Sequence, residues 1–84
     1  MNGEEEQVPR ETARRVLQAA AVEAFGRPGV YVTRELVMQR SAMVDLLMFL
    51  RIAGYLENEG WIAEADADYS MFTVTAEGLD EAMR

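Results

Sequence analysis

The segment 43–53 constrains the fold of this chain more than any other. It reads Met-Val-Asp-Leu-Leu-Met-Phe-Leu-Arg-Ile-Ala, so nine of its eleven residues are apolar. The stretch 42–59 has no proline, has Gly54 as its only glycine and is followed by Gly60, which predicts one long helix. Such a helix is apolar nearly all round and must be buried on most of its faces.

A chain of 84 residues has one small core and covers one or two faces of such a helix. We expect a second copy to cover the rest, because a two-fold axis lets one patch cover itself. The predicted homodimer interface consists of Met43, Leu47, Met48, Leu50, Arg51, Tyr55 and Trp61. In the alternative interpretation, Met43, Leu47 and Met48 are ordinary core residues packed against the first helix. Trp61 can also be interpreted in two ways, either as an exposed anchor for a partner or as a residue that closes the core.

The amino-acid composition excludes most catalytic chemistry. The chain has no His and no Cys, and its eight basic residues are all arginine. The usual general base, the commonest transition-metal ligand, the Schiff-base amine and the thiolate nucleophile are therefore missing. We therefore expect that this protein is not an enzyme, binds no cofactor and has no metal site. The acidic cluster Glu64, Asp66 and Asp68 lacks the glycine and distal glutamate of an EF-hand loop, and it is interpreted as a solvated hairpin tip.

Composition and charge also predict the organisation of the chain. With 50% hydrophobic residues it should fold despite a net charge of −7. We expect residues 1–8 to form a disordered acidic tail and residues 9–84 to form a single domain. The sequence has neither an apolar run of about 18 residues nor a basic N-terminal segment followed by an apolar one. We therefore expect a cytoplasmic protein that makes no membrane contact.

The first part of the domain has helical periodicity. After Pro9 and before Gly26, apolar residues form the stripe Ala13, Val16, Leu17, Ala20, Ala21 and Ala24. Proline suits a first helical turn and glycine suits a C-terminal cap, so these two residues mark the ends of a helix. Residues 30–32 favour a short strand.

A second helix is predicted over residues 34–40. Thr33 offers a hydroxyl for its N-cap, and Leu36 and Val37 are expected to face inward. Ser41 can cap the third helix in the same way.

After Gly60 the period changes from helical to two. Residues 61–65 and 69–75 flank a turn-prone spacer and predict a β-hairpin, with Ile62, Phe72 and Val74 facing inward. Thr75 can cap a terminal helix over residues 76–83, with Leu79 and Met83 on the core side.

Two strings, Leu-Glu-Asn-Glu-Gly-Trp-Ile at 56–62 and Phe-Thr-Val-Thr-Ala-Glu-Gly-Leu at 72–79, carry a family resemblance. They resemble the end of the third helix and the wing of winged helix-turn-helix domains, particularly MarR-like and PadR-like regulators. The second strand of that family runs into Thr-x-x-Gly, matched here by Thr75 and Gly78. The resemblance spans about residues 36–79. It implies an α+β, winged-helix-like domain in the order helix, short strand, helix, helix, β-hairpin, helix.

The sequence departs from the family pattern in its second and third helices. The second helix is short, and the third is about one turn too long. Since residues 33–53 contain neither proline nor glycine, the two helices can also be one continuous helix, which would remove the helix-turn-helix.

The resemblance implies DNA binding through the third helix, with the wing touching the backbone. Such contacts need basic or amide side chains. Only Arg51 in segment 43–53 fits this need, and the predicted hairpin is acidic.

We therefore expect a non-catalytic protein–protein interaction module of winged-helix type, homodimeric through its third helix and part of a regulatory complex. The alternative is a DNA-binding transcriptional regulator that uses a patch of Arg10, Arg14, Arg34 and Arg40.

Overall fold

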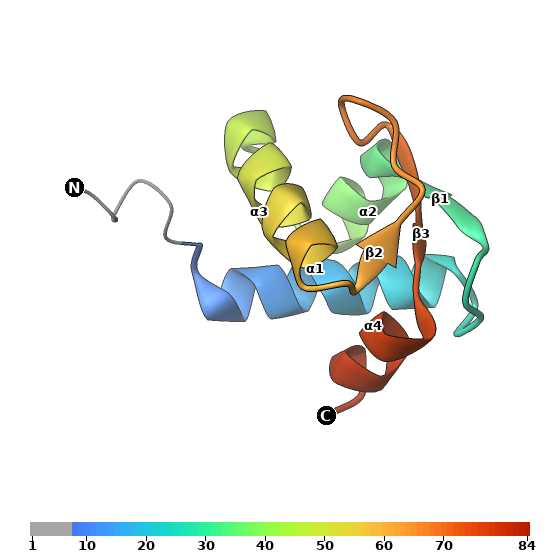
Figure 1. Cartoon of the computed structure of the whole chain (residues 1–84). Helices are drawn as coiled ribbons and strands as arrows, with labels where there is room; N and C mark the ends of the chain where they lie inside the picture. The colour runs from blue at the N-terminus through green and yellow to red at the C-terminus, as the bar shows by residue number, and fades with distance from the viewer. Residues whose placement is uncertain (1–7) are drawn as a thin grey trace.

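The computed structural model describes residues 8–84. Within them the chain forms a small α+β body with four helices and a three-stranded antiparallel sheet (Figure 1). The elements are α1 (Arg10–Glu23), β1 (Tyr31–Thr33), α2 (Arg34–Arg40), α3 (Leu46–Asn58), β2 (Ile62–Ala63), β3 (Met71–Val74) and α4 (Ala76–Ala82). The α+β class and the order of elements are those that the sequence predicts.

The sheet has β3 in its centre and strand order β1-β3-β2. The predicted hairpin supplies β2 and β3, and β1 joins from the other side, with Val32 opposite Phe72. The three residues predicted to face inward from the hairpin are all buried: Ile62, Phe72 and Val74. Thr73 is buried too, and its hydroxyl donates to the carbonyl oxygen of Ala63 at 3.1 Å.

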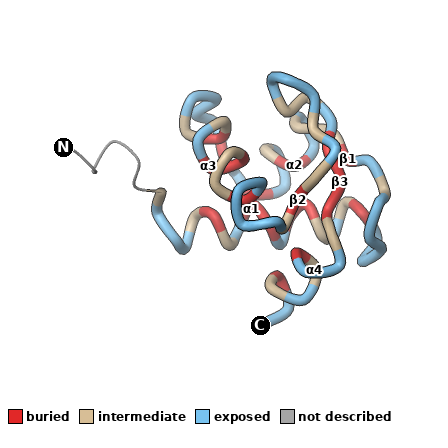
Figure 2. Tube along the Cα trace, viewed as in Figure 1, coloured by how far each residue is buried: buried red, intermediate tan, exposed pale blue. Residues whose placement is uncertain are grey.

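Helix α1 crosses the middle of the molecule, with α3 on one side and α4 on the other (Figure 1). Most of its predicted stripe is buried: Ala13, Val16, Leu17, Ala20 and Ala24. Ala21 is only half-buried, and Ala19 is buried in addition. Phe49 of α3 and Phe72 of β3 meet at the centre of this core with their ring centroids 6.4 Å apart. Figure 2 shows the buried residues on the inward sides of the elements.

Helices α2 and α3 are separate, which overturns the alternative of one continuous helix. The third helix begins at Leu46 and not, as the sequence predicts, at residue 42. Ala42 adopts a left-handed conformation with φ 58, which no helix can continue through. Asp45 caps α3 by accepting a hydrogen bond from the Met48 amide at 3.2 Å. Ser41 does not cap α3 as predicted, because its hydroxyl donates back to the carbonyl oxygen of Val37 at 2.7 Å.

Two side chains predicted to face the core are exposed. Leu36 on α2 is 48% exposed and Met83 after α4 is 84% exposed, whereas their neighbours Val37 and Ala82 are buried. Both helices are only seven residues long, so one narrow face of each reaches the core. The caps of these helices are as predicted, with Thr33 accepting from Leu36 and Thr75 accepting from Gly78.

The predicted N-terminal tail covers residues 1–8, of which the structure describes only Val8. Residues 1–7 of the predicted tail lie outside the described residues. Val8, also assigned to the tail, is half-buried and packs against the core. Over residues 8–84, none of the helices combines the length and the apolar content needed to cross a bilayer.

Candidate interaction surface

Helix α3 buries one face and presents another to solvent. Its buried residues are Phe49, Ile52, Ala53 and Leu56. At about 100° per residue, Leu47 and Arg51 lie away from this face and are exposed, whereas Met48 and Tyr55 lie between the two faces and are half-buried against the core. Leu47 is 73% exposed, and Val44, just before the helix, is 92% exposed. We call Val44, Leu46, Leu47, Met48 and Arg51 the α3 surface.

The predicted interface residues do not all lie on this surface. Met43 has to be removed from the set, because it is 8% exposed and belongs to the core of its own chain. Its amide donates to the carbonyl oxygen of Met38 at 2.8 Å, which turns residue 43 back toward α2. Leu50 is half-buried against the core. For Met43 the core alternative is the correct one, Met48 is half-buried against the core, and Leu47 is exposed.

The sequence interpretation missed Val44 and Leu46 as surface residues. Leu46 is 44% exposed because it stands at the first helical position, outside the packed part of α3. The signal was available in Asp45, since an aspartate directly before an apolar run is a strong N-cap. Recognising that cap would have placed Val44 outside the helix.

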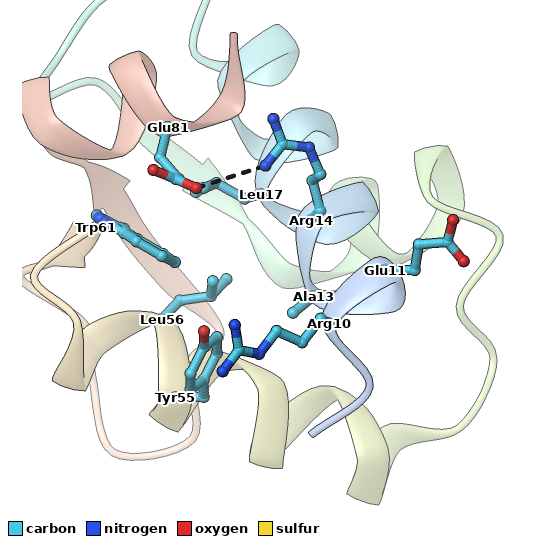
Figure 3. A pocket seen from close by; sticks show the side chains of 9 residues that line it. All are labelled: Arg10, Glu11, Ala13, Arg14, Leu17, Tyr55, Leu56, Trp61 and Glu81. Atoms are coloured by element: carbon cyan, nitrogen blue, oxygen red, sulfur yellow. Dashed lines mark hydrogen bonds and ion pairs between the residues drawn. The ribbon is translucent and has the colours of Figure 1, made fainter. Parts of the chain in front are cut away.

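Tyr55 and Trp61 form a second feature at the other end of α3. Their rings pack edge to face, with centroids 6.0 Å apart and planes at 86°. They wall a pocket of about 250 Å³ whose floor is apolar: Ala13, Leu17 and Leu56 (Figure 3). Trp61 is half-buried there, so it lines the pocket and stands apart from the α3 surface.

The predicted arginine patch does not come together. Arg10 and Arg14 line the Trp61 pocket, whereas Arg34 and Arg40 lie at the two ends of α2. Arg14 pairs with Glu81 at 3.4 Å (Figure 3), and the guanidinium of Arg40 donates to Glu23 at 2.7 Å. These carboxylates neutralise the cations that phosphate contacts would need.

Arg34 is also paired, and its partner belongs to the acidic hairpin tip. It donates to the carbonyl oxygen of Asp68 at 2.8 Å and lies 3.9 Å from the carboxylate of that residue. Because the side chain of Asp68 is largely exposed, this pair adds little stability. Because Arg34 is paired with Asp68, its guanidinium is not free to contact a phosphate group of a nucleic acid.

The other two carboxylates of the tip have partners of their own. Ser70 donates its hydroxyl to Asp66, and this hydrogen bond lowers the pKa of Asp66. Tyr31 donates its hydroxyl to Glu64 at 2.8 Å, and this bond raises the pKa of Tyr31 because the nearby carboxylate disfavours a tyrosinate. Each carboxylate is therefore held by a different neighbour. In the part of the chain that the structure describes, no three residues of His, Cys, Asp or Glu gather where they could hold a metal ion.

Comparison of the chain with family models, with curated proteins and with solved structures finds no match.

Proposed function

We propose that this protein is a non-catalytic interaction module that forms a homodimer through the α3 surface. The observation that carries the proposal is the exposure of Val44 and Leu47, at 92% and 73%, beside the half-exposed Leu46. Burying one such side chain contributes about 1.5–3 kcal/mol, so a few per subunit can offset the cost of association.

Charge complementarity supports a second copy as the partner. Asp45 begins α3, and Arg51 follows it within two helical turns, with Met48 between them. If two copies of α3 pack antiparallel about an axis near Met48, Asp45 of each copy lies opposite Arg51 of the other. Asp45 already accepts one bond from its own helix, and its carboxylate can accept more.

A winged-helix class for this module belongs to the same proposal. It is supported by the order of elements and by β1 pairing with the second strand of the hairpin. DNA binding has weaker support, because Arg14, Arg34 and Arg40 each face a carboxylate. The α3 face that would meet a DNA groove is mostly apolar.

Site-specific cross-linking tests the proposed dimer. The chain contains no cysteine, so Met48→Cys introduces a single thiol. A two-fold axis near residue 48 brings the two thiols within the short span that a disulfide requires. We expect Met48→Cys to give a covalent dimer under mild oxidation, and Leu47→Glu added to it to abolish the product.

Leu36→Cys is the matched control, since Leu36 is an exposed leucine on another helix. Its cross-linking should be slow and unaffected by Leu47→Glu. Equal rates for Met48→Cys and Leu36→Cys would contradict a dimer through α3.

A further inference from the structure

Phe25 occupies a backbone position that normally belongs to glycine. Its amide donates to the carbonyl oxygen of Val22 and the Gly26 amide donates to that of Ala21, both at 2.9 Å. This pair of bonds is the Schellman motif, in which the first residue after the C-cap adopts a left-handed conformation. Phe25 does so with φ 58, a region that L side chains disfavour.

The same residue exposes its aromatic ring. Phe25 is 82% exposed, so the ring contributes almost nothing to the core. A glycine or asparagine would suit the turn better and would leave no apolar ring in water. Neither the backbone nor the packing of the isolated chain accounts for a phenylalanine at this position.

Phe25 stands at the rim of an apolar groove between α1 and α4. The groove has a volume of about 400 Å³ and is lined by Ala21, Val22, Phe25, Gly26, Leu79 and Met83. Val22 and Met83 are 53% and 84% exposed. A benzene ring fits a cavity of about 150 Å³, so the groove has room for an aromatic ring from outside.

We propose that this groove, the α1–α4 groove, takes a second copy of the chain, with Phe25 of each copy in the groove of the other. A two-fold interface requires one surface to carry both the projecting group and its recess, and this surface carries both. A buried phenylalanine contributes about 150–250 Å², and with Val22 and Met83 the patch reaches roughly half of the ~800 Å² per partner of a standard interface. The association is therefore weak and dependent on concentration.

The α1–α4 groove and the α3 surface can be occupied at the same time. In the view of Figure 1, α3 and α4 are seen on either side of α1, and none of the residues that line the groove belongs to α3. One two-fold axis cannot cover both surfaces, so the homodimer can associate further through its grooves. The groove inference uses none of the residues of the α3 surface and stands independently of it.

Light scattering over a dilution series of four chains tests the inference. The wild type should exceed a dimer at high concentration, Phe25→Asn should stop at a dimer, and Leu47→Glu should also stop at a dimer. The double variant should be a monomer, which is a twofold drop in mass from either single variant. If Leu47→Glu stays monomeric at millimolar concentration, the groove interface is overturned. If the α3 proposal is the one that fails, the single variant Phe25→Asn is monomeric and Leu47→Glu is still a dimer.

Ala42→Asn is the matched control, and thermal unfolding is the second readout. Ala42 is an exposed residue with the same φ of 58, outside the groove. Since asparagine tolerates the left-handed region, neither Phe25→Asn nor Ala42→Asn should lower the Tm of dilute protein, and only Phe25→Asn should change the mass. A marked fall in Tm for Phe25→Asn, or an equal loss of association in Ala42→Asn, overturns the inference.

Discussion

Gly78, in the first turn of α4, lies against the backbone of Trp61. A Cβ atom added to it would stand 2.0 Å from the carbonyl oxygen of Trp61 and 3.0 Å from Cγ1 of Val74. The same Trp61 oxygen accepts a hydrogen bond from the Thr75 amide at 3.0 Å, so it cannot move away freely. Glycine is required here by a close approach of α4 to the segment before β2, and not by its own backbone angles.

We expect Gly78→Ala to lower the free energy of unfolding by about 1–3 kcal/mol, as overpacking does, although alanine favours a helix over glycine by about 1 kcal/mol. Gly54→Ala is the control, because a Cβ there meets only the Tyr69 hydroxyl at 3.9 Å. That variant should raise the free energy of unfolding by about 1 kcal/mol. Urea unfolding measures both, and a stabilised Gly78→Ala would contradict the close approach.

Tyr69 should make stability depend on alkaline pH. Its hydroxyl donates to Glu57 at 2.5 Å, and this hydrogen bond is the main reason that its pKa rises to about 12. Because the folded pKa lies above the ordinary tyrosine value near 10, the contribution of Tyr69 is complete below pH ~10 and is lost as pH rises toward 12.

Ultraviolet titration of tyrosinate, compared between wild type and Tyr69→Phe, measures this group. The highest-pH step should disappear in Tyr69→Phe, and the loss of stability above pH ~10 should become shallower. A wild-type chain in which every tyrosine titrates near 10 would rule out the Glu57 contact in solution.

At the scale of elements, the break between α2 and α3 determines what α3 exposes. The left-handed Ala42 and the Asp45 cap delay the helix until Leu46. As a result Met43 turns into the core, while Val44 stays outside on the surface. If the helix had begun at residue 42, Met43 and Val44 would both have belonged to it.

Asp45→Ala should therefore destabilise the start of α3 by about 1 kcal/mol, because it removes the side chain that accepts from the Met48 amide. Asp45→Asn should retain most of the stability, since asparagine caps as well as aspartate. Urea unfolding of dilute protein distinguishes them. If the two variants lost equal free energy of unfolding, the stabilising contribution of Asp45 would come from its charge and not from the cap.

At the scale of the whole molecule, a net charge of −7 opposes association between copies. The Debye length falls from about 30 Å to about 8 Å between 0.01 M and 0.15 M salt, so the repulsion is largely screened at the higher concentration. The exposed Asp45–Arg51 pairs of the proposed dimer contribute at most about 1 kcal/mol each and do not reverse this trend.

We expect homotypic association to become tighter as salt rises over this range, as measured by sedimentation equilibrium. DNA binding has the opposite dependence, because salt weakens contacts to phosphate. Retention on a heparin column that decreases with salt would favour the DNA-binding alternative, and association that weakens with salt would contradict the role of the net charge.

The sequence by itself determined the features that depend on a few neighbouring residues. The α1 stripe, the hairpin strands and the caps at Thr33 and Thr75 follow from periodicity and from hydrogen bonds within one turn. These signals act over distances that the chain alone defines, and the structure contains each of them.

Only the tertiary structure decided which apolar side chains are left in water. Leu36, Leu47 and Met83 satisfy the helical pattern as well as Val37 does, yet only Val37 is buried. A helix of seven residues has two turns, and which of its faces is covered depends on elements distant in sequence. The exposure of the Phe25 ring is likewise decided by the tertiary structure, because it depends on how α1 ends beside α4. Burial is a property of the packed body, so a local pattern predicts an apolar face without deciding what covers it.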